Sequence, residues 1–230
     1  MTPTTAATFC PDCTLCPRLA RFLASTAHEL PDYFNKPVGP FGPAKPKLLI
    51  VGLAPGKHGA NRTGRPFTGD FAGILLYESL FALGLASAPK SVDRFDGLTL
   101  IDTRISNAVK CLPPDNKPLP EEIRTCNRYL AAELAELKSV QAILALGTIA
   151  HEAVLMATGA KKSSARFGHG NEHTLAGGRH LVDSYHCSRY NTQTRRLTSE
   201  MFRTVCTGRG VHAVDPGPAR QARDVFLRIE

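Results

Sequence analysis

The sequence lacks the features of a membrane-embedded or exported protein. No stretch reaches the roughly 18 consecutive apolar residues that a membrane span needs. Met1–Phe9 has neither the basic start nor the apolar core of a signal peptide. Tryptophan is absent, and aromatic residues make up only 7% of the chain. We therefore expect a cytoplasmic protein that has no membrane partner.

Acidic residues are also scarce. The chain has 20 Asp and Glu residues against 28 Lys and Arg, which gives a formal net charge of +8. Such an excess favours a polyanionic partner, and nucleic acid is the class it indicates. Ordinary solubility is the alternative explanation for a basic surface.

The chain has no internal repeat and no segment with the composition of an interdomain linker. Its 230 residues, 43% of them hydrophobic, are enough to bury one core and few for two. We therefore expect one domain over residues 1–230, present as a monomer. Loosely ordered ends are expected at residues 1–12 and 207–230.

Short apolar runs alternate with amphipathic segments along the chain. The expected strands are residues 47–53, 98–103, 141–146 and 181–185, and the expected helices are residues 17–30, 73–85, 120–137, 148–158 and 199–206. Strands that alternate with helices form a parallel sheet covered on both faces. The predicted fold class is therefore α/β, a three-layer α/β/α arrangement around a mostly parallel four-stranded sheet.

Seven cysteines need an explanation, because structural disulfides are rare in the cytosol. They are Cys10, Cys13, Cys16, Cys111, Cys126, Cys187 and Cys206. A Cys-x-x-Cys pair with two further cysteines indicates four thiolates on zinc or on an iron–sulfur cluster. A zinc ribbon usually has a second Cys-x-x-Cys about 15–20 residues further on. Its absence favours a [4Fe–4S] cluster that ties the N-terminal arm to the middle of the domain.

Two polar segments each follow an apolar run that is typical of a buried strand. The first covers residues 52–70 and the second residues 186–194. In open α/β sheets, the loops that leave the carboxyl ends of the strands carry the chemistry. The first segment contains Phe67 and Asp70, and the second begins with His186. We therefore expect an aromatic ring, an acid and an imidazole to meet in one pocket.

These segments carry a family resemblance. Gly52-Leu-Ala-Pro55 is no phosphate loop, because it lacks the Gly-Lys-Ser/Thr ending of a Walker loop. Together with Gly64-Arg-Pro-Phe-Thr-Gly-Asp70 and His186-Cys-Ser-Arg-Tyr-Asn-Thr-Gln-Thr194, it resembles the uracil-DNA glycosylase superfamily. Gly-Leu-Ala-Pro is similar to the first motif of the type-5 iron–sulfur branch. The resemblance spans roughly residues 13–206.

The resemblance implies both a cofactor and an activity. The implied ligands of a structural [4Fe–4S] cluster are Cys13, Cys16, Cys111 and Cys126, which leaves Cys10 over. The implied activity is that of a monofunctional DNA glycosylase, which flips uracil out of DNA, hydrolyses its N-glycosidic bond and releases free uracil without a lyase step. The partner is then uracil-containing DNA, double- or single-stranded. The branch is also expected to accept hypoxanthine or other damaged bases.

The residue types fit this chemistry. Phe67 offers a face on which a flipped pyrimidine can stack, unless it is an ordinary core residue. His186 can donate a hydrogen bond to a uracil carbonyl and stabilise the departing anion. Asp70 can stabilise the sugar cation or orient the attacking water, or it can simply cap the helix that follows.

Two asparagines compete to read the base. Asn107 stands where other branches of the superfamily place an amide, and Asn116 lies in a Pro-Pro-Asp-Asn-Lys-Pro loop typical of the type-5 branch. An amide can pair with both a carbonyl and the imide N–H of uracil. Either residue can instead belong to an ordinary turn. We assign Asn116 to the catalytic set, and the substrate-binding set is Gly52, Leu53, Ala54, Phe67 and Asn107.

Basic and polar residues on both walls are candidate DNA contacts. They are His58, Arg62, Arg65, Arg189, Tyr190, Asn191 and Gln193. Tyr190 or Gln193 can fill the gap left by a flipped nucleotide, while the arginines meet phosphates. Each charged residue can instead be a solvated surface residue. The alternative function is that of an iron–sulfur nucleic-acid binding protein without glycosylase activity.

Overall fold

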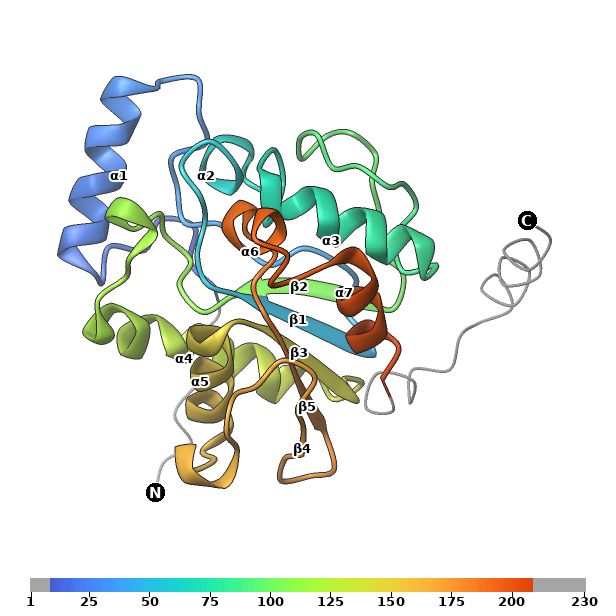
Figure 1. Ribbon diagram of the computed structural model, residues 1–230. Helices are drawn as coiled ribbons and strands as arrows, with labels where there is room; N and C mark the ends of the chain where they lie inside the picture. Colours follow the sequence, from blue (N-terminus) through green and yellow to red (C-terminus); the bar gives the residue numbers. More distant parts are fainter. Residues whose placement is uncertain (1–8, 209–230) are drawn as a thin grey trace.

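The computed structural model describes residues 9–208, which form a sheet with helices on both faces (Figure 1). The strand order is β2-β1-β3-β5-β4. The four parallel strands are β1 (Leu48–Gly52), β2 (Thr103–Asn107), β3 (Ala142–Leu146) and β5 (His180–Ser184). The predicted α/β class and mostly parallel sheet are confirmed. Residues 1–8 and 209–230, which include most of the expected loose ends, lie outside the described residues.

The prediction of a four-stranded sheet is wrong, because a fifth strand lies at the edge. β4 (Glu172–Thr174) pairs antiparallel with β5. Its residues are exposed or half-buried and include no apolar run. Apolar runs mark strands that are buried on both faces, so a short polar edge strand escapes that criterion.

The second predicted strand, residues 98–103, is misplaced, since β2 covers Thr103–Asn107. The leucines that suggested it are buried in the core outside the sheet. β2 instead carries polar side chains that have a partner on a helix. Arg104 Nε donates to Glu133 Oε1 at 2.8 Å, and Ser106 Oγ donates to Glu133 Oε2 at 2.6 Å. A partner on another element makes polar residues acceptable in a buried strand.

Helices cover both faces because successive side chains of a strand point to opposite sides. α3 (Phe71–Ala82) and α7 (Ser199–Cys206) pack on one face, and α4 (Pro120–Glu136) and α5 (Thr148–Thr158) pack on the other. The five predicted helices are confirmed, with small shifts at their ends. The remaining helices are α1 (Pro17–Glu29), α2 (Ala60–Thr63), α6 (Arg189–Gln193), and the 3₁₀ turns η1 (Pro114–Asn116) and η2 (Lys162–Ser164).

The strand order reverses between β1 and β3. From β1 the chain continues to β2 on one side of it, and it later returns to β3 on the other side. At such a point the loops leave the two strands in opposite directions and open a crevice at their carboxyl ends. Both polar segments singled out in the sequence begin at this edge of the sheet.

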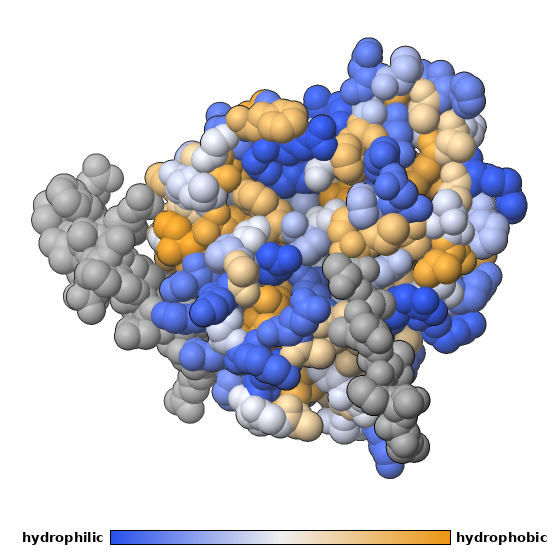
Figure 2. Space-filling model, turned by 180° about the vertical axis from the view of Figure 1, so that it is seen from behind, coloured by the Kyte–Doolittle hydropathy of each residue, from blue (hydrophilic) through white to orange (hydrophobic). Residues whose placement is uncertain are grey.

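The surface is mixed in character. On the face seen in Figure 2, the hydrophobic areas of the described residues are interspersed with hydrophilic ones. Such a mixture is usual, since more than half of the accessible surface of folded proteins is apolar. Within residues 9–208, none of the helices combines the length and the hydrophobicity that crossing a membrane requires.

Candidate active site and cysteine cluster

A large pocket opens at the carboxyl end of β1. It is lined by the loop after β1, the start of α3, η1 and the segment after β5. The predicted site residues that line it are Leu53, Ala54, His58, Arg62, Phe67, Asp70, Asn116, His186 and Arg189. The two segments predicted to be its walls therefore face one space.

The rings of Phe67 and His186 lie next to each other in this pocket. Their centroids are 5.9 Å apart and their planes are inclined by 33°. A flat base between two rings needs them roughly 7 Å apart, twice the ~3.4 Å spacing of stacked bases. The spacing therefore leaves no room for a base between them. A base can stack on the free face of Phe67 and present its edge to His186.

Phe67 has a left-handed backbone conformation, with φ +53°, which is rare for a bulky residue. Neighbouring hydrogen bonds hold this turn. The Tyr77 hydroxyl donates to the Pro66 carbonyl oxygen at 2.9 Å, and the hydroxyls of Thr68 and Ser91 are 2.7 Å apart. Phe67 is 6% exposed and lines the pocket. It is therefore a core residue and a pocket wall at once.

Gly52 allows this close packing at the end of β1. A Cβ at Gly52 would lie 2.5 Å from Asn107 Oδ1 and 2.5 Å from Phe67 Cζ. Both neighbours would have to move to accommodate any side chain. Glycine therefore lets two candidate base contacts approach the strand end.

Asp70 caps α3 and also lines the pocket. Its Oδ1 accepts a hydrogen bond from the backbone N–H of Gly73 at 2.9 Å. Its Oδ2 lies against Gly59, where a Cβ would collide with it. Burial raises the pKa of the Asp70 carboxyl, although the backbone N–H groups of Gly73 and Ala72 act to lower it. Capping and catalysis are compatible, because the two oxygens have different surroundings.

The His186 imidazole is enclosed, and burial lowers its pKa below the usual 6.5. It is therefore neutral at physiological pH, with one nitrogen available to donate a hydrogen bond. Asn191 Nδ2 donates to the His186 carbonyl oxygen at 2.8 Å. The Ser188 hydroxyl caps α6 by accepting from the Asn191 N–H. The structure thus gives the Asn191 side chain a role in holding His186.

The two asparagines occupy different parts of the site. Asn107 is 2% exposed, and within residues 9–208 its Oδ1 has no hydrogen-bond partner. An unpaired buried oxygen is costly, and a ligand that donates to it removes the cost. Asn116 is exposed in η1, has φ +56° and lines the pocket. Asn116 therefore lines the pocket, whereas Asn107 does not and lies behind the lining, with its Oδ1 directed at Gly52.

The candidate DNA contacts on α6 are exposed. Tyr190 is 70% exposed, and Gln193 is exposed on the same helix. The Arg189 guanidinium lies 5.2 Å from the centroid of the Phe71 ring. These side chains are free to meet a ligand that covers the pocket.

On the other wall, Arg62 and His58 are exposed and line the pocket. Arg65 does not, and its prediction as a DNA contact is wrong. Its side chain is 5% exposed, pairs with Asp96 at 2.7 Å and lies 4.4 Å from the centroid of the Phe41 ring. This role could not be predicted from the motif, because both partners lie more than 20 positions away in the chain.

Sequence reasoning missed one part of the pocket wall. It consists of Phe71, Ile74, Lys90, Ser91 and Val92, on α3 and in the loop after it. These residues do not directly follow a strand. They are therefore not predicted by the criterion that sites lie in the loops at the carboxyl ends of strands. The only sequence signal is a group of basic and apolar residues in a stretch without helical or strand periodicity.

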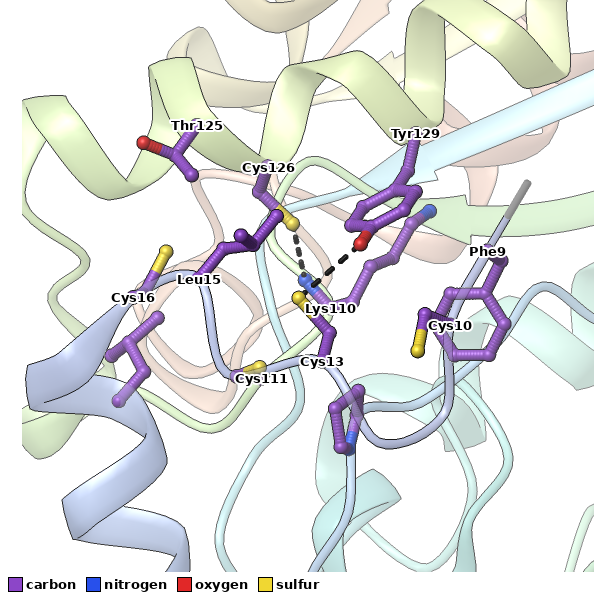
Figure 3. Close-up of a pocket in the computed structure, with 12 residues that line it drawn as sticks. Phe9, Cys10, Cys13, Leu15, Cys16, Lys110, Cys111, Thr125, Cys126 and Tyr129 are labelled. Atoms are coloured by element: carbon purple, nitrogen blue, oxygen red, sulfur yellow. Dashed lines mark hydrogen bonds between the residues drawn. The ribbon is translucent and has the colours of Figure 1, made fainter. Parts of the chain in front are cut away.

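Four thiols meet in a small cavity between the N-terminal arm, the loop after β2 and α4. Cys13, Cys16, Cys111 and Cys126 surround one space, and Cys10 lies at its side (Figure 3). Burial raises the pKa of Cys16 to about 11 and that of Cys111 to about 12, and neighbouring thiols add to both shifts. These thiols need a bound cation to become thiolates at physiological pH.

Two donors face the sulfurs. The Lys110 N–H donates to Cys126 Sγ at 3.3 Å, and the Tyr129 hydroxyl donates to Cys13 Sγ at 3.2 Å (Figure 3). Hydrogen bonds of this kind stabilise and orient sulfur ligands of metal centres.

A protein-family model described as the uracil DNA glycosylase superfamily matches residues 40–207. The chain belongs to this superfamily. A type-5 uracil-DNA glycosylase from Thermus thermophilus is 49% identical over 195 residues, which cover 83% of this chain and 89% of the relative. A type-5 uracil-DNA glycosylase from Pyrobaculum aerophilum is 41% identical over 198 residues, covering 84% and 86%. A type-4 uracil-DNA glycosylase from Thermotoga maritima is 34% identical over 143 residues, covering 62% and 65%. The resemblance to the type-5 branch is confirmed.

The spacing of the four cysteine sulfurs differs from that around a single zinc ion. Zn–S bonds of about 2.3 Å in a tetrahedral site place the sulfurs about 3.8 Å apart. Among the described residues, no three of these sulfurs lie within 4.8 Å of one another. A [4Fe–4S] cluster binds each thiolate to a different iron and therefore spaces the sulfurs more widely.

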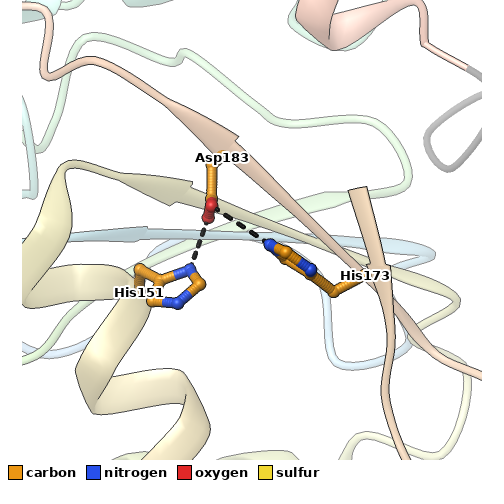
Figure 4. A group of neighbouring side chains, drawn as sticks. All are labelled: His151, His173 and Asp183. Carbon is orange, nitrogen blue, oxygen red and sulfur yellow. Dashed lines mark hydrogen bonds and ion pairs between the residues drawn. The ribbon is translucent and has the colours of Figure 1, made fainter. Parts of the chain in front are cut away.

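A second buried polar group, missed in the sequence, joins α5, β4 and β5 (Figure 4). His151 Nδ1 lies 2.7 Å from Asp183 Oδ1, and His151 Nε2 lies 3.1 Å from the Ala165 carbonyl oxygen. Both nitrogens of His151 thus face an oxygen that can accept a hydrogen bond, an arrangement that favours the imidazolium form. His173 Nε2 completes the group, 3.6 Å from Asp183 Oδ2. The ion pair satisfies these groups without a metal.

Proposed function

We propose that this protein is a type-5 uracil-DNA glycosylase that hydrolyses the N-glycosidic bond of uracil in DNA. The observation that carries the proposal is the pocket at the end of β1, where Phe67, Asp70 and His186 converge in a chain of this superfamily. A module that only binds DNA has no need for a buried carboxylate and a neutral imidazole in one pocket.

The base enters the pocket after it has been flipped out of the helix. Its face stacks on Phe67, a contact that contributes roughly 1–3 kcal/mol. Asn116 lines the pocket and contacts the nucleotide nearer the opening, whereas Asn107 lies behind the lining at Gly52, and its unpaired Oδ1 is the proposed acceptor for the imide N–H of uracil. Leu53 and Ala54 form an apolar part of the wall, which is consistent with tolerance of hypoxanthine and other damaged bases.

Bond cleavage puts negative charge on the base and positive charge on the sugar. The C1′–N1 bond breaks, and its electron pair leaves on uracil, where the neutral His186 donates a hydrogen bond to a carbonyl oxygen. A water oxygen bonds to C1′ and its proton passes to the Asp70 carboxylate, which also stabilises the sugar cation. The uracil anion then takes up a proton from solvent and Asp70 releases the proton that it accepted, so the products are free uracil and an abasic site.

The reaction is hydrolysis without a lyase step. A lyase needs an amine that attacks the sugar. Lys57 lines the pocket, but its Nζ lies 3.0 Å from Glu29 Oε2 and is engaged in that ion pair. Lys90 also lines the pocket but belongs to neither motif, so we propose that the enzyme is monofunctional.

We further propose that Cys13, Cys16, Cys111 and Cys126 hold a [4Fe–4S] cluster with a structural role. When bound, the cluster supplies four Fe–S bonds that join the N-terminal arm to the loop after β2 and to α4. The chain's own donors, the Lys110 N–H and the Tyr129 hydroxyl, orient two of the sulfurs.

Release of free uracil from a labelled duplex tests the proposal, with alkaline strand scission as a second readout. His186→Ala, Asp70→Asn and Asn107→Ala are each expected to lower the single-turnover rate by about 100-fold or more. His28→Ala, which changes an exposed histidine on α1, is the matched control and is expected to retain full activity. Full activity in all three site variants, or DNA binding without uracil release by the wild type, would contradict the proposal.

A further inference from the structure

A loop beside the pocket exposes two large apolar side chains. It comprises residues 90–96, between α3 and β2 (Figure 1), and Val92 is 62% and Phe95 81% exposed. Lys90, Ser91 and Val92 line the same pocket as Phe67 and His186. The loop is therefore part of the surface that a substrate in this pocket must pass.

Hydrogen bonds to one carboxylate hold the loop in place. Asp96 Oδ2 accepts from the N–H of Val92 at 2.8 Å, and Asp96 Oδ1 accepts from the N–H of Leu98 at 2.9 Å. The Arg65 guanidinium pairs with Asp96 Oδ1 and also donates to Ser91 Oγ at 2.9 Å. Val92 and Phe95 therefore lie on a turn whose conformation is held by these hydrogen bonds.

The same bracing connects the loop to the base pocket. Ser91 Oγ lies 2.7 Å from Thr68 Oγ1, and Thr68 follows Phe67 in the chain. Arg65 precedes the strained Phe67 turn by two positions. The loop is thus connected to the segment that carries the Phe67 ring in two ways: by the Ser91–Thr68 hydrogen bond and by the contacts of Arg65 with Ser91 and Asp96.

The charges around the loop favour DNA as its partner. The Arg94 guanidinium lies 4.7 Å from the centroid of Phe95 and 4.9 Å from that of Phe34. Lys90 and the arginines of the opposite wall add positive charge, and Glu78 is the one carboxylate besides Asp70 among the described residues of the pocket lining. The loop's own carboxylates are engaged within it: Asp93 accepts from the Phe95 N–H, and Asp96 accepts from the Val92 N–H and pairs with Arg65. Apolar side chains flanked by cations are the features with which proteins enter a DNA groove, where the apolar residue packs on sugars and bases.

We propose that residues 90–96 form a second DNA-contacting element, separate from α6. Val92 and Phe95 pack into the groove of the double helix beside the flipped nucleotide, while Lys90 and Arg94 meet the phosphates. Arg65 is a positioning residue that holds this loop and the Phe67 turn together. This inference rests on the proposed glycosylase function, and it adds a part of the enzyme that recognises the duplex around the lesion.

The test compares duplex and single-stranded substrates that carry the same uracil. Phe95→Ser combined with Val92→Ser is expected to raise KM for the duplex and to lower the duplex-to-single-strand ratio of kcat/KM by about tenfold. Met156→Ser, which removes an exposed apolar side chain on α5, is the matched control and should leave the ratio unchanged. An unchanged ratio in the double variant overturns the proposal, as does an equal loss on both substrates.

Fluorescence anisotropy with a labelled duplex reads the loop independently of catalysis. The double variant should bind the duplex about tenfold more weakly while the slope of log Kd against log salt stays the same, whereas Arg62→Ala should reduce that slope by about 1. If wild-type protein releases no uracil but the double variant still loses duplex binding, the proposed function fails, and of this inference only the contact between the loop and duplex DNA is supported. Unchanged duplex binding by the double variant overturns the inference.

Discussion

Asp70 shows how one side chain can serve both the fold and the reaction. One of its oxygens caps α3 and the other faces the pocket beside Gly59. The cap fixes the rotamer of the carboxylate, so it is oriented before a substrate arrives. Its raised pKa follows from the same enclosure, because burial disfavours the charged form.

The pH dependence of catalysis follows from this carboxylate. Asp70 must be ionised to stabilise the sugar cation, and its pKa lies above the ordinary 3.8. We therefore expect the single-turnover rate to fall as the pH is lowered, with a midpoint above 3.8. The same acid limb should persist in the residual activity of His186→Ala and disappear in Asp70→Asn. An acid limb that vanishes in His186→Ala instead would assign the titration to the imidazole.

What the sequence predicts at this scale depends on how far away a residue's partners lie. Phe67, Asp70 and His186 stand in continuous motifs, and the structure places all three in one pocket. Arg65 belongs to the same motif, but its partner Asp96 comes from a distant loop. The motif therefore indicates where Arg65 lies and gives no information on what its guanidinium binds.

At the scale of secondary-structure elements, apolar runs predict three of the four parallel strands and miss β2 and the edge strand. β1 and β3 are apolar because helices cover both of their faces, and β5 carries the apolar pair Leu181 and Val182. β2 carries Arg104 and Ser106, which depend on Glu133 of α4. The edge strand β4 buries too little surface to require apolar residues. The first failure arises because the residue pattern does not reveal partners on other elements, and the second because an edge strand needs no apolar run.

The group formed by His151, His173 and Asp183 links three of these elements (Figure 4). Burial opposes a charge on His151, but the hydrogen bond and the negative charge of Asp183 outweigh it and raise the His151 pKa above 6.5. The folded state thus binds this proton more tightly than the unfolded state. The stabilisation is complete below about pH 6.5 and is lost as the pH rises through the folded-state pKa.

Replacement of His151 should therefore cost more stability at low pH than at high pH. His151→Gln is expected to lower the free energy of unfolding by about 3–5 kcal/mol at pH 6, because it leaves Asp183 buried without its cation. The difference from wild type should shrink at pH 9. Urea unfolding of both proteins at the two pH values measures it, with His28→Gln as an exposed control. An equal difference at both pH values would show that His151 is neutral in the folded protein.

At the scale of the whole molecule, the N-terminal segment is tied to the middle of the chain. Arg18 on α1 forms two hydrogen bonds to the carboxylate of Glu122 on α4, each 2.8 Å long. The backbone N–H of Val38 donates to the Lys110 carbonyl oxygen at 2.7 Å. The four proposed cluster ligands lie in the same region. The cluster would therefore add to the hydrogen bonds that already join the N-terminal segment to the middle of the chain.

Loss of the cluster should therefore destabilise the entire fold. The geometry of the base pocket should be lost as a consequence. A cross-link that closes a loop of about 100 residues stabilises a protein by roughly 4–5 kcal/mol, since it restricts the unfolded chain. Cys126→Ser is expected to lose the yellow-brown absorption at roughly 400 nm that iron–sulfur proteins show, and to unfold at a lower urea concentration. Cys10→Ser, which changes the cysteine outside the set of four, should keep both the colour and the stability. Wild-type protein that is colourless and releases zinc when its thiols are blocked would assign the four sulfurs to zinc, and a colour loss in Cys10→Ser would place Cys10 among the ligands.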